Sequence, residues 1–358
     1  MSLAKGDDET EFFNTSSSIT LGPNTVDDDI WSRAYAPKEV DPMVYNISCC
    51  YLGIIGVVGI LGNGYSITLY ISRKKLQTPF NFVLMNLIYA EFLSAAYGIP
   101  VDFAASFAYG WKFGKVFCII TGFILTTTGM VCIFTLTYLT VHRYFCVFHP
   151  FFVSYVESKY IIISSTIWIL SLSISIPPLF GWSTYAPESS GMSCAPSWED
   201  EKYLMYLVYI LILGFIIPSF IFMYTSFSII CCMKKKNHGR TMLEHRVPKR
   251  KNTQDRKSRI NRMVLLMVLC FQVCWFPYAF VSMYRVFIGD VPVIYTVFPV
   301  QFAKSGVCWN PFIYIIMNKE FKKEMVLDQI GIPMQKTFPN ASDPTMNENM
   351  ESQQSIEL

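Results

Sequence analysis

Long apolar stretches alternate with short polar segments along this chain of 358 residues. A helix of about 20 mostly apolar residues can cross a bilayer, and each stretch is long enough to do so. We therefore predict an all-α membrane protein, a seven-transmembrane helix bundle with polar tails at residues 1–42 and 329–358. The stretches that make up the single domain at 43–328 are 43–71, 80–105, 116–147, 159–180, 203–232, 260–288 and 293–317.

Composition supports a membrane protein, because 52% of the residues are hydrophobic and only 15% are charged. Lys and Arg are concentrated after the first stretch, between the fifth and sixth, and after the last, which predicts that these segments are cytoplasmic. The N-terminal tail is acidic and is therefore expected outside, at the plasma membrane. Basic clusters beside membrane spans indicate topology and contact with lipid rather than nucleic-acid binding.

Eleven cysteines are present, and most lie within the apolar stretches, where a thiol packs as a small apolar group. Cys118 and Cys194 fall on the predicted outer side, where two cysteines most economically pair as a disulfide. Asn14 begins an Asn-Thr-Ser sequence on the outer tail and is a candidate glycosylation site. No metal site is expected.

Lys304 lies in the middle of the seventh apolar stretch. An ammonium near the bilayer centre costs several kcal/mol, so such a residue is a candidate functional site. Burial disfavours its charged form and makes the amine available for Schiff-base chemistry. From position alone, a lysine that lines an aqueous cavity or pairs with a structural acid explains the residue equally well.

Polar residues and prolines inside the spans are characteristic of a known family. The first two spans contain Asn63 and Glu91, the sixth contains Trp275 and Pro277, and the seventh contains an Asn-Pro-x-x-Tyr sequence that begins at Asn310. Over residues 45–328 the chain resembles the rhodopsin-like G-protein-coupled receptors. The amphipathic segment that starts at Lys319 resembles the short eighth helix of that family.

Within that family the chain resembles the opsins. Phe302-Ala-Lys304-Ser305, six residues before Asn310, resembles the opsin retinal-attachment sequence, and the segment from Pro178 to Glu188 resembles the loop that caps the opsin pocket. The resemblance implies retinal bound to Lys304 through a protonated Schiff base, 11-cis in the dark and all-trans after light. The further residues that it implies for the pocket are Trp275, Tyr278, Phe215, Thr126 and Gly122.

A protonated Schiff base needs a nearby anion, and the resemblance leaves two candidates for this counterion. Many vertebrate visual opsins have a glutamate three residues after the third-span cysteine, where this chain has Thr121. Glu188 matches the counterion position of many invertebrate and bistable opsins, and Asp102 resembles that of some cnidarian opsins. We expect Asp102 to dominate with Glu188 in support, in a non-vertebrate, bistable pigment. Either carboxylate could instead be structural.

The cytoplasmic end departs from the family pattern. His142 precedes Arg143 and Tyr144 where relatives usually have an acid, and Lys257 stands where many opsins have another acid. Arg143 is therefore expected to be held weakly, with high dark activity, unless His142 and other polar groups hold it differently. The residues that the resemblance assigns to coupling and activation are His142, Arg143, Tyr144, Glu91, Asn310, Pro311 and Tyr314.

The resemblance implies a light-activated receptor rather than an enzyme. Its expected partners are a heterotrimeric G protein, arrestin, a receptor kinase, membrane lipids and, in a dimer, a second copy of the chain. One alternative is a retinal photoisomerase, which would release 11-cis-retinal instead of signalling. Another is a receptor for a peptide or amine, in which Lys304 has no special role.

Overall fold

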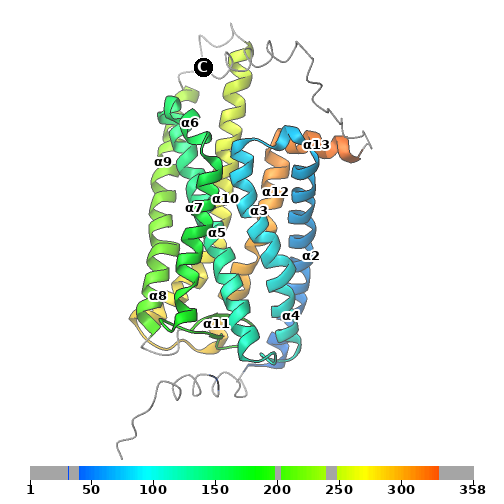
Figure 1. Cartoon of the computed structure of the whole chain (residues 1–358), viewed down its shortest axis with the longest axis vertical. Coiled ribbons are helices and arrows are strands. Elements are labelled where there is room, and N and C mark those ends of the chain that lie inside the picture. The colour runs from blue at the N-terminus through cyan, green and yellow to red at the C-terminus, as the bar shows by residue number, and fades with distance from the viewer. Residues whose placement is uncertain (1–30, 32–39, 198–202, 239–247, 330–358) are drawn as a thin grey trace, which may run out of the picture.

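The computed structural model describes residue 31 and residues 40–197, 203–238 and 248–329. The candidate glycosylation site Asn14 lies outside these residues. Long helices run side by side along one axis (Figure 1). They are α2 (Pro42–Ser72), α3 (Pro79–Leu93) with α4 (Ile99–Phe107), α5 (Lys115–Phe148), α7 (Tyr160–Ser175), α8 (Leu204–Leu211) with α9 (Ile217–His238), α10 (Pro248–Phe287), and α11 (Val293–Lys304) with α12 (Gly306–Met317).

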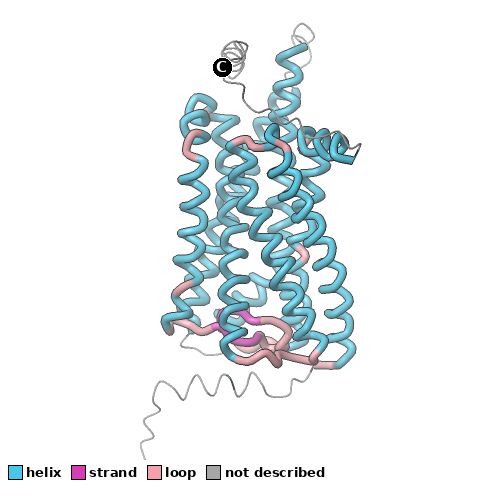
Figure 2. The backbone as a smooth tube through the Cα atoms, turned by 45° about the vertical axis from the view of Figure 1, so that its right-hand side comes forward, coloured by secondary structure: helices cyan, strands magenta, loops and turns pink. Residues whose placement is uncertain are grey.

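The two ends of the bundle carry different short elements. The helices α6 (Pro150–Glu157) and α13 (Lys319–Gln329) lie at one end, which we call the α13 end (Figure 1). Strands β1 (Tyr185–Pro187) and β2 (Cys194–Pro196) pair antiparallel at the opposite end, which we call the hairpin end (Figure 2). The α13 end is the one predicted to be cytoplasmic.

Local sequence explains where the helices begin and end. Asp41 accepts a hydrogen bond from the amide of Met43 and so caps α2, while Thr78 caps α3 in the same way. Each cap is followed by a proline at the first helical position, where the missing N–H costs nothing. The long helix α5 ends at Phe148, because Pro150 disfavours a helical conformation in the residue before it, His149.

Six helices of the described residues are long and apolar enough to span a membrane. The seventh predicted stretch, 293–317, is helical too, but a break at Ser305 divides it into α11 and α12, and neither half is long enough alone. Two other spans contain a wide π turn, at Ser94–Gly98 between α3 and α4 and at Ile212–Ile216 between α8 and α9. The predicted seven-helix bundle is therefore confirmed, with local irregularities in three spans.

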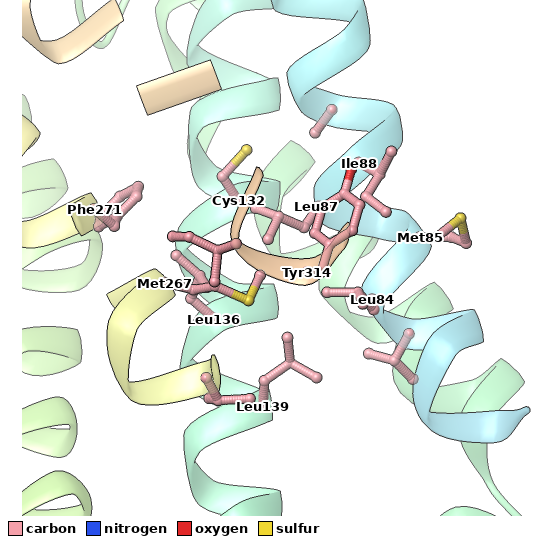
Figure 3. Packing of buried hydrophobic residues seen from close by; sticks show 14 of the residues in the cluster. Leu84, Met85, Leu87, Ile88, Cys132, Leu136, Leu139, Met267, Phe271 and Tyr314 are labelled. Atoms are coloured by element: carbon pink, nitrogen blue, oxygen red, sulfur yellow. The ribbon is translucent and has the colours of Figure 1, made fainter. Parts of the chain in front are cut away.

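Apolar side chains from most of the helices, α13 included, form the main core, and Figure 3 shows part of it. Leu87 of α3, Leu136 of α5 and Met267 of α10 surround Tyr314 of α12, and all four are almost completely buried. Tyr314, predicted to take part in activation, thus lies inside the core rather than at its surface.

At the hairpin end, a disulfide joins Cys118 of α5 to Cys194 of β2, with the two Cα atoms 5.6 Å apart. The predicted pairing is confirmed. Trp31 and Trp111 pack against the disulfide in a small buried cluster. The bond fixes the β-hairpin across the end of the bundle (Figure 2), where Met192 of the hairpin turn contacts Gln301 of the seventh span.

Candidate functional site

The most unusual contact inside the bundle is a buried ion pair. Lys304 Nζ lies 2.8 Å from Asp102 Oδ2, and the side chains are 17% and 1% exposed. Lys304 ends α11 and Asp102 is in the first turn of α4, so the pair joins the seventh span to the second. A charge removed from water is tolerated only when it is paired, and each partner here neutralises the other.

Irregular backbone positions both members of the pair. The π turn at Ser94–Gly98 precedes Asp102 by one helical turn. Its backbone hydrogen bond joins residues i and i+5, so the turn contains one residue more than an α-helical turn. This extra residue rotates the remainder of the span by about 100°. Lys304 is the last residue before the break at Ser305, whose hydroxyl donates to the carbonyl of Phe302 at 2.7 Å. Asp102 therefore follows a π turn and Lys304 precedes a helix break, so each charged residue lies next to a departure from regular α-helical geometry.

Glu188 brings a second carboxylate to the same region. It lies in the turn between β1 and β2, is 5% exposed, and its amide donates to the carbonyl of Ser193 at 2.8 Å. Its carboxylate contacts the hydroxyl of Tyr278 and interacts electrostatically with both Lys304 and Asp102. Burial, opposed in part by Lys304 and assisted by Asp102, raises the pKa of Glu188 to about 7.

The predicted aromatic residues of the sixth span line the opposite side of this region. Trp275 stacks on Phe271 with ring centroids 5.7 Å apart and meets Tyr278 edge-on at 5.9 Å. A Cβ added at Gly129 of α5 or at Gly306 of α12 would lie 3.7 or 3.8 Å from the Trp275 ring. Trp275 therefore fits between the third and seventh spans, just past the break after Lys304.

Gly122 and Thr126 of α5 both adjoin Tyr185 of β1. A Cβ at Gly122 would lie 2.6 Å from the Tyr185 ring, so a larger residue there would displace the hairpin. Thr126 is within hydrogen-bonding reach of the Tyr185 hydroxyl, which donates to the carbonyl of Ser175 at 2.8 Å. Phe215 is half-buried in the π turn at Ile212–Ile216 of the fifth span.

A second polar group lies between the ion pair and the main core. Asn310 donates a short hydrogen bond to Glu91, and both side chains are buried. Asn63 of α2 donates to the carbonyls of Gly59 and Val307, at 3.0 and 2.9 Å. These hydrogen bonds join α12 to α2 and α3 next to Pro311. Tyr314 follows Pro311 in the next turn of α12.

At the α13 end, Arg143 contacts His142, and His142 contacts Glu157, a residue that sequence reasoning missed. Arg143 Nη2 lies 2.7 Å from His142 Nδ1, and His142 Nε2 lies 3.2 Å from Glu157 Oε1. The neighbouring Tyr144 instead faces Tyr224, with the hydroxyls 3.4 Å apart. The alternative in which His142 holds Arg143 therefore agrees with the geometry. Glu157 carried no signal in the sequence, because only the fold of α6 brings it to α5.

Comparisons with known proteins agree with this architecture. The family model described as 7 transmembrane receptor (rhodopsin family) matches residues 62–314. A green-sensitive opsin of Gallus gallus is 31% identical over 294 residues, covering 80% of this chain and 81% of the relative. A rhodopsin of Sminthopsis crassicaudata is 31% identical over 297 residues, covering 80% and 82%.

Solved structures give the same result. The crystal structure of squid rhodopsin superposes with a TM-score of 0.73 at 25% identity, covering 89% of this chain and 93% of that one. The match extends over the bundle and beyond the residues of the family model. This chain is therefore a multi-pass membrane protein of the rhodopsin family of seven-transmembrane receptors, and within that family it belongs with the opsins.

Proposed function

We propose that this protein is a light-activated G-protein-coupled receptor that binds retinal covalently at Lys304. The observation that carries the proposal is the buried pair of Lys304 and Asp102, an amine and an acid at the centre of an apolar bundle. An intramembrane ionisable residue of this kind is a functional site by default. Membership of the opsins supports retinal as the bound group.

The residues around Lys304 fit such a group. Its nitrogen is fully buried, it faces a carboxylate, and aromatic rings and the hairpin enclose the region. Retinal, bound to an amine as a Schiff base, supplies a double bond that light isomerises from 11-cis to all-trans. Asp102 keeps the proton on Lys304 Nζ by offering the negative charge that the bilayer interior otherwise lacks.

Asp102 is the better candidate for the dominant counterion. It contacts Lys304 Nζ directly at 2.8 Å, whereas Glu188 makes its hydrogen bond to Tyr278. The Ser193 hydroxyl is within hydrogen-bonding reach of Asp102, and the Ser193 carbonyl accepts from the Glu188 amide. The hairpin thus supports both carboxylates, but only Asp102 lies against the amine.

The route from Lys304 to the α13 end runs through the seventh span. Both Gly306 and Asn310 belong to α12, which follows the Ser305 break: Gly306 adjoins Trp275, and Asn310 donates a hydrogen bond to Glu91. A displacement at Lys304 would press on Trp275 and move α12 relative to α3 and α10. Tyr314 would then leave the buried core, which is the kind of discrete repacking that switches a receptor between two states.

The topology proposed for this receptor has its α13 end in the cytoplasm of a photoreceptor cell and its hairpin outside. The positive segments flanking the spans support this orientation. A heterotrimeric G protein is the proposed partner at Arg143, with arrestin and a receptor kinase acting at the same end. Dimer formation, glycosylation at Asn14 and a bistable photoproduct remain predictions.

An absorbance spectrum tests the function. Purified receptor with added 11-cis-retinal is expected to show a band well to the red of free retinal, and Lys304→Ala is expected to abolish it. Light should then accelerate nucleotide exchange on a purified G protein. Isomer turnover without exchange would favour the photoisomerase, and an unchanged spectrum in the Lys304→Ala variant would favour an ordinary receptor.

Glu188 gives a prediction for pH. Because its pKa is raised to about 7, the carboxyl is neutral below that pH and ionised above it. We expect the dark absorbance band to shift slightly between pH 6 and 8, about one unit on either side of that pKa, as a second negative charge appears. Glu188→Gln should remove this step and retain the visible band. A step that persists in the variant would assign the titration to another group.

A further inference from the structure

A chain of contacts joins Arg143 to His142 and His142 to Glu157. The groups that can donate or accept a hydrogen bond determine where the proton on the His142 ring lies. A guanidinium only donates, so His142 Nδ1, at 2.7 Å from Arg143 Nη2, must accept. The hydrogen of a neutral imidazole is then on Nε2, which faces Glu157 Oε1 at 3.2 Å. One tautomer of neutral His142 therefore satisfies both neighbours, and a second proton on the ring would face the guanidinium.

The chain is mostly buried and ends in an anion. Arg143 and His142 are 6% and 2% exposed, and the guanidinium carbon lies 4.3 Å from the centroid of the Phe80 ring. The Glu157 side chain is 39% exposed. Its hydrogen bond from His142, opposed in part by burial and assisted by the Arg143 charge, lowers the pKa of Glu157. Glu157 is thus ionised at neutral pH.

The sixth span does not supply this anion. Lys257 of α10 approaches Cys146, which itself lies 3.8 Å from His142 Nδ1, so the residue on that side repels Arg143. Among the described residues Arg143 has no direct ion pair with a carboxylate. Glu157 is the acid that acts on it through His142. The restraint on Arg143 therefore joins α5 to α6.

We propose that Glu157 is a positioning residue for receptor activation: it holds His142, and through His142 it holds Arg143, in the resting arrangement. The inference rests on the proposed function. It implies that a movement of α10 would break no ion pair with Arg143 among the described residues, and that Arg143 is released when α6 shifts or when its contact with His142 is lost. The resting state is then controlled from the segment that joins the third and fourth spans.

Acid should release Arg143 as well. Protonation of His142 at Nδ1 removes the acceptor that Arg143 uses, so the restraint is present at high pH and is lost as pH falls through the titration of His142. The charged and titratable groups that face His142 and Arg143 are Tyr138 and Cys146 on α5, Glu157 on α6 and Lys257 on α10. Dark activity should therefore rise on acidification, and this rise should be absent in Glu157→Ala.

Dark and light-driven nucleotide exchange test the proposal, with full-length receptor and purified heterotrimers of the major Gα classes. Loss of a partly exposed hydrogen bond to a charged group predicts that Glu157→Ala raises dark exchange about three- to tenfold. Glu157→Asp should restore part of the restraint. Ser158→Ala, which removes only a local hydrogen bond to the carbonyl of Tyr155, should leave dark exchange unchanged.

A double-mutant cycle separates positioning from a general loss of structure. His142→Ala should raise dark exchange as Glu157→Ala does, and the double variant should add nothing, because both changes break one chain of contacts. The thiol of Cys146 gives a readout without G protein: its labelling in the dark by a charged thiol reagent, corrected with Cys146→Ser, should quicken in Glu157→Ala.

Unchanged dark exchange and unchanged Cys146 labelling in Glu157→Ala would overturn the proposal, and so would additive effects of the two substitutions. If no heterotrimer responded to light even with the unmutated receptor, the proposed function would fail instead. Faster Cys146 labelling in Glu157→Ala would then still support the role of Glu157 in holding the resting arrangement.

Discussion

Replacing Asp102 by asparagine is expected to move the absorbance of the retinal-bound protein from the visible to the ultraviolet at neutral pH. The substitution keeps the shape of the side chain and removes the negative charge 2.8 Å from Lys304 Nζ. Leaving one member of a buried pair unmatched costs about 3–5 kcal/mol, which corresponds to about two to four pH units. The pH at which the visible band is half lost should therefore fall by that amount, as an absorbance titration in the dark would measure.

Glu188→Gln is the matched control, because it removes the neighbouring carboxylate by the same isosteric change. Its band should stay visible at neutral pH, since Glu188 is hydrogen-bonded to Tyr278 and Asp102 remains against the amine. Added chloride or formate should restore part of the visible band in Asp102→Asn by entering the vacated position. The opposite ranking, with the ultraviolet shift in Glu188→Gln alone, would make Glu188 the dominant counterion.

Hydropathy alone predicted the spans, because a bilayer demands long apolar helices with every backbone group satisfied internally. It could not predict the direction in which Asp102 points. In an uninterrupted helix Asp102, eleven residues after Glu91, would share its face after about three turns. The π turn at Ser94–Gly98 changes the face on which Asp102 lies, and its sequence, Ser-Ala-Ala-Tyr-Gly, does not predict such a turn. The ion pair was therefore a hypothesis until the backbone was known.

The same limit applies at the α13 end. His142 and Lys257 were recognisable as departures from the family pattern, so a missing acid beside Arg143 could be inferred from the sequence. The replacement could not, because Glu157 lies beyond the end of α5 and reaches His142 only after the chain turns at Pro150 into α6. The sequence predicted a weakly held arginine, with His142 as an alternative partner, and the fold adds Glu157 from α6.

Replacing both Cys118 and Cys194 by alanine is expected to destabilise the receptor without moving its absorbance maximum. Closing a loop with a sequence separation of 76 residues stabilises a soluble protein by about 4 kcal/mol. That value is an upper limit here, because helices that persist in the bilayer already restrict the unfolded chain. The packing of Trp31 and Trp111 against the disulfide would be loosened too. The dark thermal decay of the visible band should therefore be much faster.

The position of the band provides the discriminating measurement. The disulfide fixes β2, and with it the hairpin that carries Glu188, whereas Asp102 and Lys304 lie on α4 and α11 and contact each other directly. The double variant should thus decay quickly from an unshifted maximum, whereas the exposed Cys50→Ala control should match the unmutated receptor. A large shift of the maximum would mean that the hairpin, rather than Asp102, sets the charge environment of Lys304.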